Sequence, residues 1–188
     1  MMRQEFSDMY AKIHEFDDYQ TYLTSMTPYK APAATTIGHV HLKVSDLERS
    51  LGFYTKVLGF ELTQRVGDSA VFVSAGGYHH HIGLNTWHSL GSDPAPDRAP
   101  GLYHVAILYS TRKDLAAALQ NVVGHGVKID GASDHGVSEA IYFRDPDNNG
   151  IEIHWDKPKE DWPFDAKGNL QMVSEALNLN ELLGLLKD

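Results

Sequence analysis

Residues 36–59, TIGHVHLKVSDLERSLGFYTKVLG, decide the fold. Residues 37–44 alternate between polar and apolar side chains, which predicts a strand with one buried face. The polar face of this strand is formed by His39, His41 and Lys43. Apolar side chains then recur at helical spacing, at Leu47, Leu51, Tyr54 and Leu58. Ser45 and Glu48 match a capping box at the start of this helix, and Gly59 is expected to end it.

The same order returns after a segment rich in proline and glycine. GLYHVAILYS, residues 101–110, predicts a second strand, and Thr111 predicts the start of a second helix. The matched pairs are His39-Val40 with His104-Val105, Gly59-Phe60 with Gly126-Val127, and Ile82-Gly-Leu84 with Ile151-Glu-Ile153. Extended runs follow each helix, at 60–66, 70–75 and 80–87 and again at 127–132, 138–144 and 150–156. We therefore expect an α+β fold of two tandem β-α-β-β-β modules.

The expected organisation has five parts. A helical extension with apolar residues at helix-like spacing covers residues 1–35, and a C-terminal loop and helix cover 157–188. Between them lie the first module over 36–88, a linker over 89–101 and the second module over 102–156. The two extensions suggest a dimer surface.

Composition excludes several classes of function. The chain has 188 residues, 16 basic against 25 acidic side chains and a formal net charge of −9, with no run of Lys or Arg, so neither nucleic acid nor an anionic membrane is an expected partner. It has no Cys, so a transition metal would need His, Asp, Glu or water, and His occurs 11 times. The sequence lacks a long apolar run and an apolar core near its start, which predicts a cytoplasmic protein.

Each module begins with a strand that carries His on its polar face. The last predicted strand, GIEIHWD, has Glu152 on its polar face. If the polar faces of both modules line one concavity, then His39, His104 and Glu152 can meet. Two imidazoles and one carboxylate are typical of non-haem ferrous sites with open coordination positions. A single strand His more often has a structural role, but here the same position carries His in both modules.

Residues 135–152 read HGVSEAIYFRDPDNNGIE. This stretch resembles the extradiol ring-cleavage dioxygenase signature, in which a His is followed by an aliphatic residue, Tyr, an acidic residue, Pro and a final Glu. Only Asn148 departs, where the family has Gly or Pro, and Asn tolerates a left-handed turn. The chain from about 36 to 156 is similar to the vicinal oxygen chelate superfamily, whose paired β-α-β-β-β modules hold a divalent metal in a cup.

The resemblance implies a role for each candidate residue. His39, His104 and Glu152 would be the ligands of Fe²⁺, with Mn²⁺ or another divalent metal as the alternative. A His before the apolar strand would be the acid–base catalyst. His80 fits that position best, while strand alternation favours His81, and His79 also stays open. The remaining implied positions are His135 and Tyr142 as hydrogen-bonding residues around the metal, and His41 and Val137 as pocket residues.

The activity implied is that of a non-haem iron-dependent extradiol dioxygenase of aromatic compound catabolism, which cleaves a catechol-like small aromatic diol with O₂. Gly83 stands where glyoxalase-like relatives would have a further carboxylate ligand, which disfavours a site with four protein ligands. A glyoxalase-type metal-dependent lyase or thiol transferase is the alternative. A metal-free protein that sequesters small molecules, similar to bleomycin-resistance proteins, is a third possibility.

Overall fold

The computed structural model of the chain describes residues 27–96 and 98–187. The chain divides into two compact units, Met1–Ile37 and Gly38–Asp188. In the first unit, the Thr35 N–H donates to the Pro32 carbonyl over 2.9 Å and closes a turn. The helix expected near the N-terminus lies outside the described residues. In the part of the chain that is described, no helix is long and apolar enough to cross a membrane.

The first half of the second unit forms a β-α-β-β-β module with a four-stranded sheet. Its elements are β1 (Val40–Lys43), α3 (Leu47–Gly52), the π-helical segment η1 (Phe53–Val57), β2 (Glu61–Val66), β3 (Ala70–Ser74) and β4 (Ile82–Asn85). The strand order is β1-β4-β3-β2. The pair β1 and β4 is parallel, and the other pairs are antiparallel.

The second half repeats this arrangement and adds a short strand. Its elements are β5 (Val105–Leu108), α4 (Arg112–Gly124), β6 (Ile129–Asp134), β7 (Ser138–Arg144), β8 (Gly150–Asp156), the 3₁₀ turn η2 (Lys159–Asp161), β9 (Glu175–Ala176) and α5 (Leu179–Gly184). The strand order is β5-β8-β7-β6-β9. The expected α+β fold of two β-α-β-β-β modules is confirmed.

The strand registers give the two modules matching positions. Val40 lies opposite Ile82 in the first module, as Val105 lies opposite Ile151 in the second. His39 therefore corresponds to His104, and Gly83 corresponds to Glu152. The bulge is repeated as well, between Leu62 and Gln64 in β2 and between Ile129 and Gly131 in β6. The duplication of the two modules thus includes the bulges in their strands.

The starts of α3 and α4 differ in how well the sequence predicted them. Thr111 caps α4 as expected, because its side chain accepts from the Asp114 N–H. The capping box expected at Ser45 is wrong. Asp46 is the N-cap of α3, and its carboxylate accepts from the Arg49 N–H over 3.0 Å. The Ser45 hydroxyl is engaged elsewhere, at 2.6 Å from Oδ1 of Asp147.

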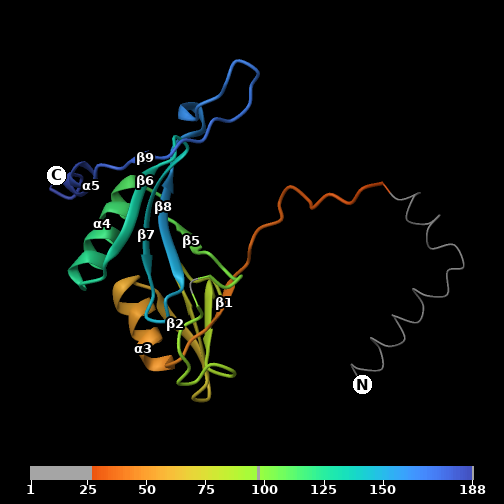
Figure 1. Ribbon diagram of the computed structural model, residues 1–188, viewed down its shortest axis with the longest axis vertical. Helices are drawn as coiled ribbons and strands as arrows, with labels where there is room; N and C mark the ends of the chain where they lie inside the picture. Colours follow the sequence, from red (N-terminus) through yellow and green to blue (C-terminus); the bar gives the residue numbers. More distant parts are fainter. Residues whose placement is uncertain (1–26, 97, 188) are drawn as a thin grey trace, which may run out of the picture. The chain divides into compact units, whose positions relative to one another are not determined.

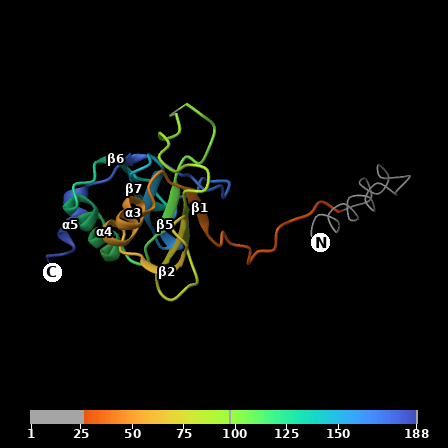
Figure 2. The same ribbon diagram turned by 90° about the horizontal axis from the view of Figure 1, so that it is seen from below.

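The apolar core lies between the sheets and their helices. Figures 1 and 2 show α3, α4 and α5 together on one side of the strands. The core takes side chains from both modules and from α5, including Val44, Tyr54, Leu84, Leu115, Leu119, Ile141, Ile153 and Leu182. Leu182 is fully buried, which attaches the C-terminal helix to the body of the molecule.

Candidate active site

β5 and β8 bring His104 and Glu152 together. Val105 lies opposite Ile151 in this parallel pair, so His104 and Glu152 both project from the other face of the sheet. Nε2 of His104 is 2.9 Å from Oε2 of Glu152. Among the described side chains, Nδ1 of His104 is buried and has no hydrogen-bond partner. An imidazole beside a carboxylate suits a divalent first-row metal, and an unpaired buried nitrogen is one mark of a site that takes a further group.

Tyr142 and His135 extend this pair into a hydrogen-bonded chain. Tyr142 lies opposite Glu152 on β7, with its hydroxyl 3.5 Å from Oε1 of Glu152. The same hydroxyl is 2.8 Å from Nε2 of His135, whose Nδ1 is 2.9 Å from the carbonyl of Val173. A carbonyl can only accept, so Nδ1 carries the proton. The Tyr142 hydroxyl has a single proton, so it donates either to Nε2 of a neutral His135 ring or to Oε1 of Glu152, and the 2.8 Å contact with His135 is the shorter of the two.

The Tyr142 phenol is held in its protonated form. Burial, followed by the nearby Glu152 carboxylate, raises the pKa of Tyr142 to about 12. The hydroxyl is therefore a hydrogen-bond donor throughout the physiological range. The part played by Val173 could not be foreseen from the sequence, because it contributes only a backbone carbonyl from a loop more than thirty residues beyond His135.

His39 and His80 form a second group at the start of β1. Their ring centroids are 4.4 Å apart, and the His80 ring is 4.9 Å from that of Phe72. Partial burial, followed by the neighbouring imidazoles of His39 and His79, lowers the pKa of His80. By contrast, Nδ1 of His81 lies 2.8 Å from the Ser74 hydroxyl. Of the three consecutive histidines, His80 is thus the one that packs on the predicted ligand His39.

His41 occupies the space where the first module would otherwise carry a counterpart of Glu152. Gly83 lies opposite His41, and a β-carbon built on Gly83 would come within 2.9 Å of the His41 ring atoms Cγ and Cδ2. The ring also packs against Phe72 and Trp87, with centroids 5.7 Å and 5.5 Å away. Burial and the nearby His39 lower the pKa of His41. The space beside Gly83, where the second module carries the Glu152 side chain, is therefore occupied by the His41 ring.

The structure places the predicted site residues in two groups. One group is the chain of His104, Glu152, Tyr142 and His135, and the other contains His39, His80 and His41. Within residues 27–96 and 98–187, no three His, Asp or Glu side chains lie close enough to hold one metal ion. His39 therefore does not complete the His104–Glu152 pair in this structure. Val137 is buried, and its carbonyl accepts from the Lys157 N–H.

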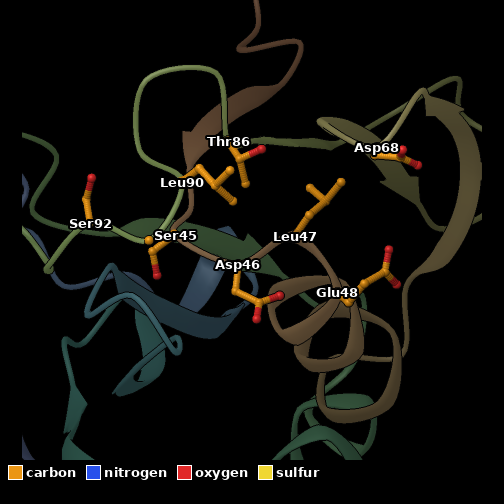
Figure 3. Close-up of a pocket in the computed structure, with 9 residues that line it drawn as sticks. Ser45, Asp46, Leu47, Glu48, Asp68, Thr86, Leu90 and Ser92 are labelled. Atoms are coloured by element: carbon orange, nitrogen blue, oxygen red, sulfur yellow. The ribbon is translucent and has the colours of Figure 1, made fainter.

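A pocket of about 660 Å³ lies elsewhere, at the start of α3 (Figure 3). It is lined by Ser45, Asp46, Leu47, Glu48, Asp68, Thr86, Leu90, Gly91 and Ser92. None of the predicted site residues lines it. Its three carboxylates, from Asp46, Glu48 and Asp68, oppose the binding of a negatively charged ligand. The candidate site is therefore the surface around His104 and Glu152.

Comparison with known proteins identifies the family of this fold. The model of the Glyoxalase/Bleomycin resistance protein/Dioxygenase superfamily matches residues 36–153, well over half of the chain. The chain belongs to this superfamily. A protein of Bacillus subtilis (strain 168) named catechol-2,3-dioxygenase is 39% identical over 150 residues, which are 79% of this chain and 51% of that protein. The chain thus spans about half the length of this curated relative.

Other relatives within the superfamily carry different names. The manganese-dependent 2,3-dihydroxybiphenyl 1,2-dioxygenase of Geobacillus genomosp. 3 is 26% identical and covers 71% of this chain and 41% of its own length. A probable lactoylglutathione lyase of Synechocystis is 28% identical over 65% of this chain and 97% of its own. A solved superfamily domain from Frankia sp. EAN1pec has a TM-score of 0.57 at 24% identity, over 66% of this chain and 94% of that one, which supports the fold.

Proposed function

We propose that this protein is a metal-dependent extradiol dioxygenase that cleaves a catechol-like aromatic diol with O₂. The observation that carries the proposal is the chain of contacts from His135 through Tyr142 to Glu152, with Nε2 of His104 2.9 Å from the Glu152 carboxylate. Three members of this chain are the His, Tyr and Glu of the ring-cleavage signature in residues 135–152. The identity of 39% to a protein named catechol-2,3-dioxygenase supports the same activity.

His104 and Glu152 would hold the metal, and His39 would be the third ligand. We propose Fe²⁺, with Mn²⁺ as the alternative that the name of the Geobacillus relative supports. The chemistry that such an ion supplies when bound is Lewis acidity toward the diol oxygens and redox access to O₂. His39 would have to approach the pair from the first module, since it packs on His80 in this structure.

The residues around the metal would move and hold protons. The lowered pKa of His80 keeps its ring neutral near pH 7, so it can accept a proton from a diol hydroxyl. Tyr142, with a pKa of about 12, would donate a hydrogen bond and keep its proton. The Val173 carbonyl fixes the orientation of His135, and His135 in turn orients Tyr142. We propose that His41 and Val137 border the diol.

Oxygen uptake tests the proposal directly. The protein would be purified without oxygen, loaded with Fe²⁺ or Mn²⁺ and mixed with a panel of catechols in aerated buffer. We expect one O₂ consumed per diol, with a yellow product. Metal binding without oxygen uptake for any diol would contradict the proposal. Cell fractionation and native mass measurement would test the cytoplasmic location and the homodimer that we also propose.

Tyr142→Phe tests the hydrogen bond donated by the Tyr142 hydroxyl without removing a proposed metal ligand. Phe keeps the ring but removes the hydroxyl that lies between His135 and Glu152. We expect kcat to fall by about 100-fold, the usual cost of losing one positioned hydrogen-bond donor, and metal affinity to fall by about tenfold at most. Tyr29→Phe, at an exposed tyrosine, is the matched control. Unchanged kcat in Tyr142→Phe would remove Tyr142 from the mechanism.

A glyoxalase-type lyase is the second candidate, because the Synechocystis relative is named a probable lactoylglutathione lyase. Gly83 opposes this reading, since it leaves the first module without a counterpart of Glu152. Isomerisation of a glutathione hemithioacetal by the zinc or nickel form, together with no oxygen uptake by the iron form, would favour the lyase. A protein that takes up no metal but binds small aromatic molecules would favour sequestration.

A further inference from the structure

The turn between β7 and β8 carries two carboxylates that reach from the second module to the first. Asp147 accepts from the N–H of Ser45 over 3.0 Å and from its hydroxyl over 2.6 Å. It also accepts from the Ser50 hydroxyl over 2.9 Å and from Nη2 of Arg49 over 2.6 Å. The neighbouring Asp145 accepts from the Tyr54 hydroxyl over 3.0 Å. These six residues, Ser45, Arg49, Ser50, Tyr54, Asp145 and Asp147, are called the module latch here.

Burial and hydrogen bonds hold the carboxylates of the module latch in fixed positions. The side chain of Asp147 is only 6% exposed, so its hydrogen bonds compete little with water. Asp145 stiffens the turn by accepting from the N–H groups of Asp147 and Asn149 over 2.9 Å and 2.8 Å. The turn at residues 165–169 has the same internal bonds, with Asp165 accepting from Lys167 and Asn169. The second turn offers a matched comparison, because these partners of Asp165 lie within its own turn.

The latch lies between the two strands that carry the proposed ligands of separate modules. Ser45 follows β1, which begins next to His39, and Asp147 precedes β8, which contains Glu152. The edge strands β1 and β5 lie close together in both views (Figures 1 and 2). We infer that the module latch holds the two modules in one relative placement, from which the His39 side chain has to turn away from His80 to join the His104–Glu152 pair. Its residues are positioning residues, and this inference rests on the proposed function only where metal is involved.

Metal titration tests the latch in the presence of a ligand. Apo protein would be titrated with Mn²⁺ while circular dichroism monitors the fold. We expect Asp147→Asn and Arg49→Ala to raise the Kd for Mn²⁺ by about tenfold or more, the size of effect seen when residues that orient metal ligands are lost. The matched controls Asp165→Asn and Arg65→Ala should keep Kd within about twofold of the unsubstituted protein. If Asp147→Asn stays folded and binds Mn²⁺ normally, the inference is wrong.

Spin labels test the latch without metal. The chain has no Cys, so the exposed pair Glu61→Cys on β2 and Lys113→Cys on α4 would label one site in each module. We expect a narrow distance distribution that broadens with Asp147→Asn and stays narrow with Asp165→Asn. Ser50→Ala, which removes a single latch bond, replaces Asp147→Asn if that variant fails to fold.

The two experiments separate the inference from the proposed function. If the unsubstituted protein binds no divalent ion, the proposed metal site is wrong, and the label distances alone decide on the latch. If those distances do not change when Asp147 or Ser50 is substituted, the latch does not set the placement of the modules.

Discussion

Gly83 is the residue at which the two modules differ most clearly in chemistry. A β-carbon there would come within 2.9 Å of the His41 ring. We therefore expect Gly83→Ala to lower the free energy of unfolding by about 1–3 kcal/mol, the usual cost of overpacking. In a His41→Ala background the same substitution should cost much less, because the opposing ring is gone. Urea unfolding of the four proteins measures this coupling, and equal costs in both backgrounds would show that His41 is not the obstacle.

The sequence indicated single residues of the candidate site where the side chain itself can bind a metal or donate a hydrogen bond. The sequence indicated His135, Tyr142 and Glu152, and the structure places them in contact. It also allowed for a left-handed turn at Asn148, whose φ is 65°. It did not reveal that the His41 ring lies over Gly83, because that contact depends on the pairing of β1 with β4. Nor did it reveal that the His80 ring packs on His39 while the His81 ring lies beside the Ser74 hydroxyl.

At the scale of elements, the start of α3 gives a sharp prediction. Asp46 is the N-cap, with its carboxylate 3.0 Å from the Arg49 N–H. Asp46→Ala should therefore lower the free energy of unfolding by about 1 kcal/mol, whereas Asp46→Asn should change it little because Asn caps equally well. Thermal or urea unfolding would measure both variants. An equal loss in Asp46→Asn would mean that the charge of Asp46, and not its capping bond, stabilises the helix.

The strands were predicted best where turns bound them on both sides. The expected runs 138–144 and 150–156 match β7 and β8 to the residue, because the polar turn between them interrupts two apolar runs. The run expected at 80–87 is longer than β4, which begins at Ile82. His79 and His80 lie before the point where β4 begins to pair with β1 at Val40. The apolar pattern of the sequence thus located each strand. Its first and last residues depend on where the neighbouring strand begins and stops pairing with it.

At the scale of the whole molecule, the sequence predicted two modules but not how they meet. The bonds between Asp147 and Ser45 join residues 102 positions apart, and neither residue type nor periodicity points to them. The three proposed ligands came from the polar faces of the predicted strands and from the family resemblance, and neither gives the distance between them. His104 and Glu152 meet because they share one sheet. His39 belongs to the other sheet, so its approach depends on how the modules are held together.

The contact between modules should make stability depend on pH in the acid range. Burial opposes the charge of Asp147, but hydrogen bonds from Ser45, Ser50 and Arg49 outweigh it and lower the pKa below its ordinary value of 3.8. A lowered pKa in the folded state stabilises the protein above that ordinary value, and this contribution is lost as the pH falls through the folded value. Burial raises the pKa of Asp145, which acts in the opposite direction and reduces the net slope.

Asp147→Asn should therefore flatten the fall in unfolding free energy below about pH 4, since the group that takes up the proton is gone. Urea unfolding at a series of pH values from about 6 to 3 would measure the slope, with the exposed Asp93→Asn as the matched control. We expect the plot of unfolding free energy against pH to be less steep for Asp147→Asn than for the unsubstituted protein. Loss of a hydrogen-bond acceptor alone would instead lower the unfolding free energy by the same amount at every pH. If Asp147→Asn lowers stability equally at pH 6 and pH 3, the Asp147 carboxylate joins the modules by its shape and hydrogen bonds, and its charge contributes nothing to holding them.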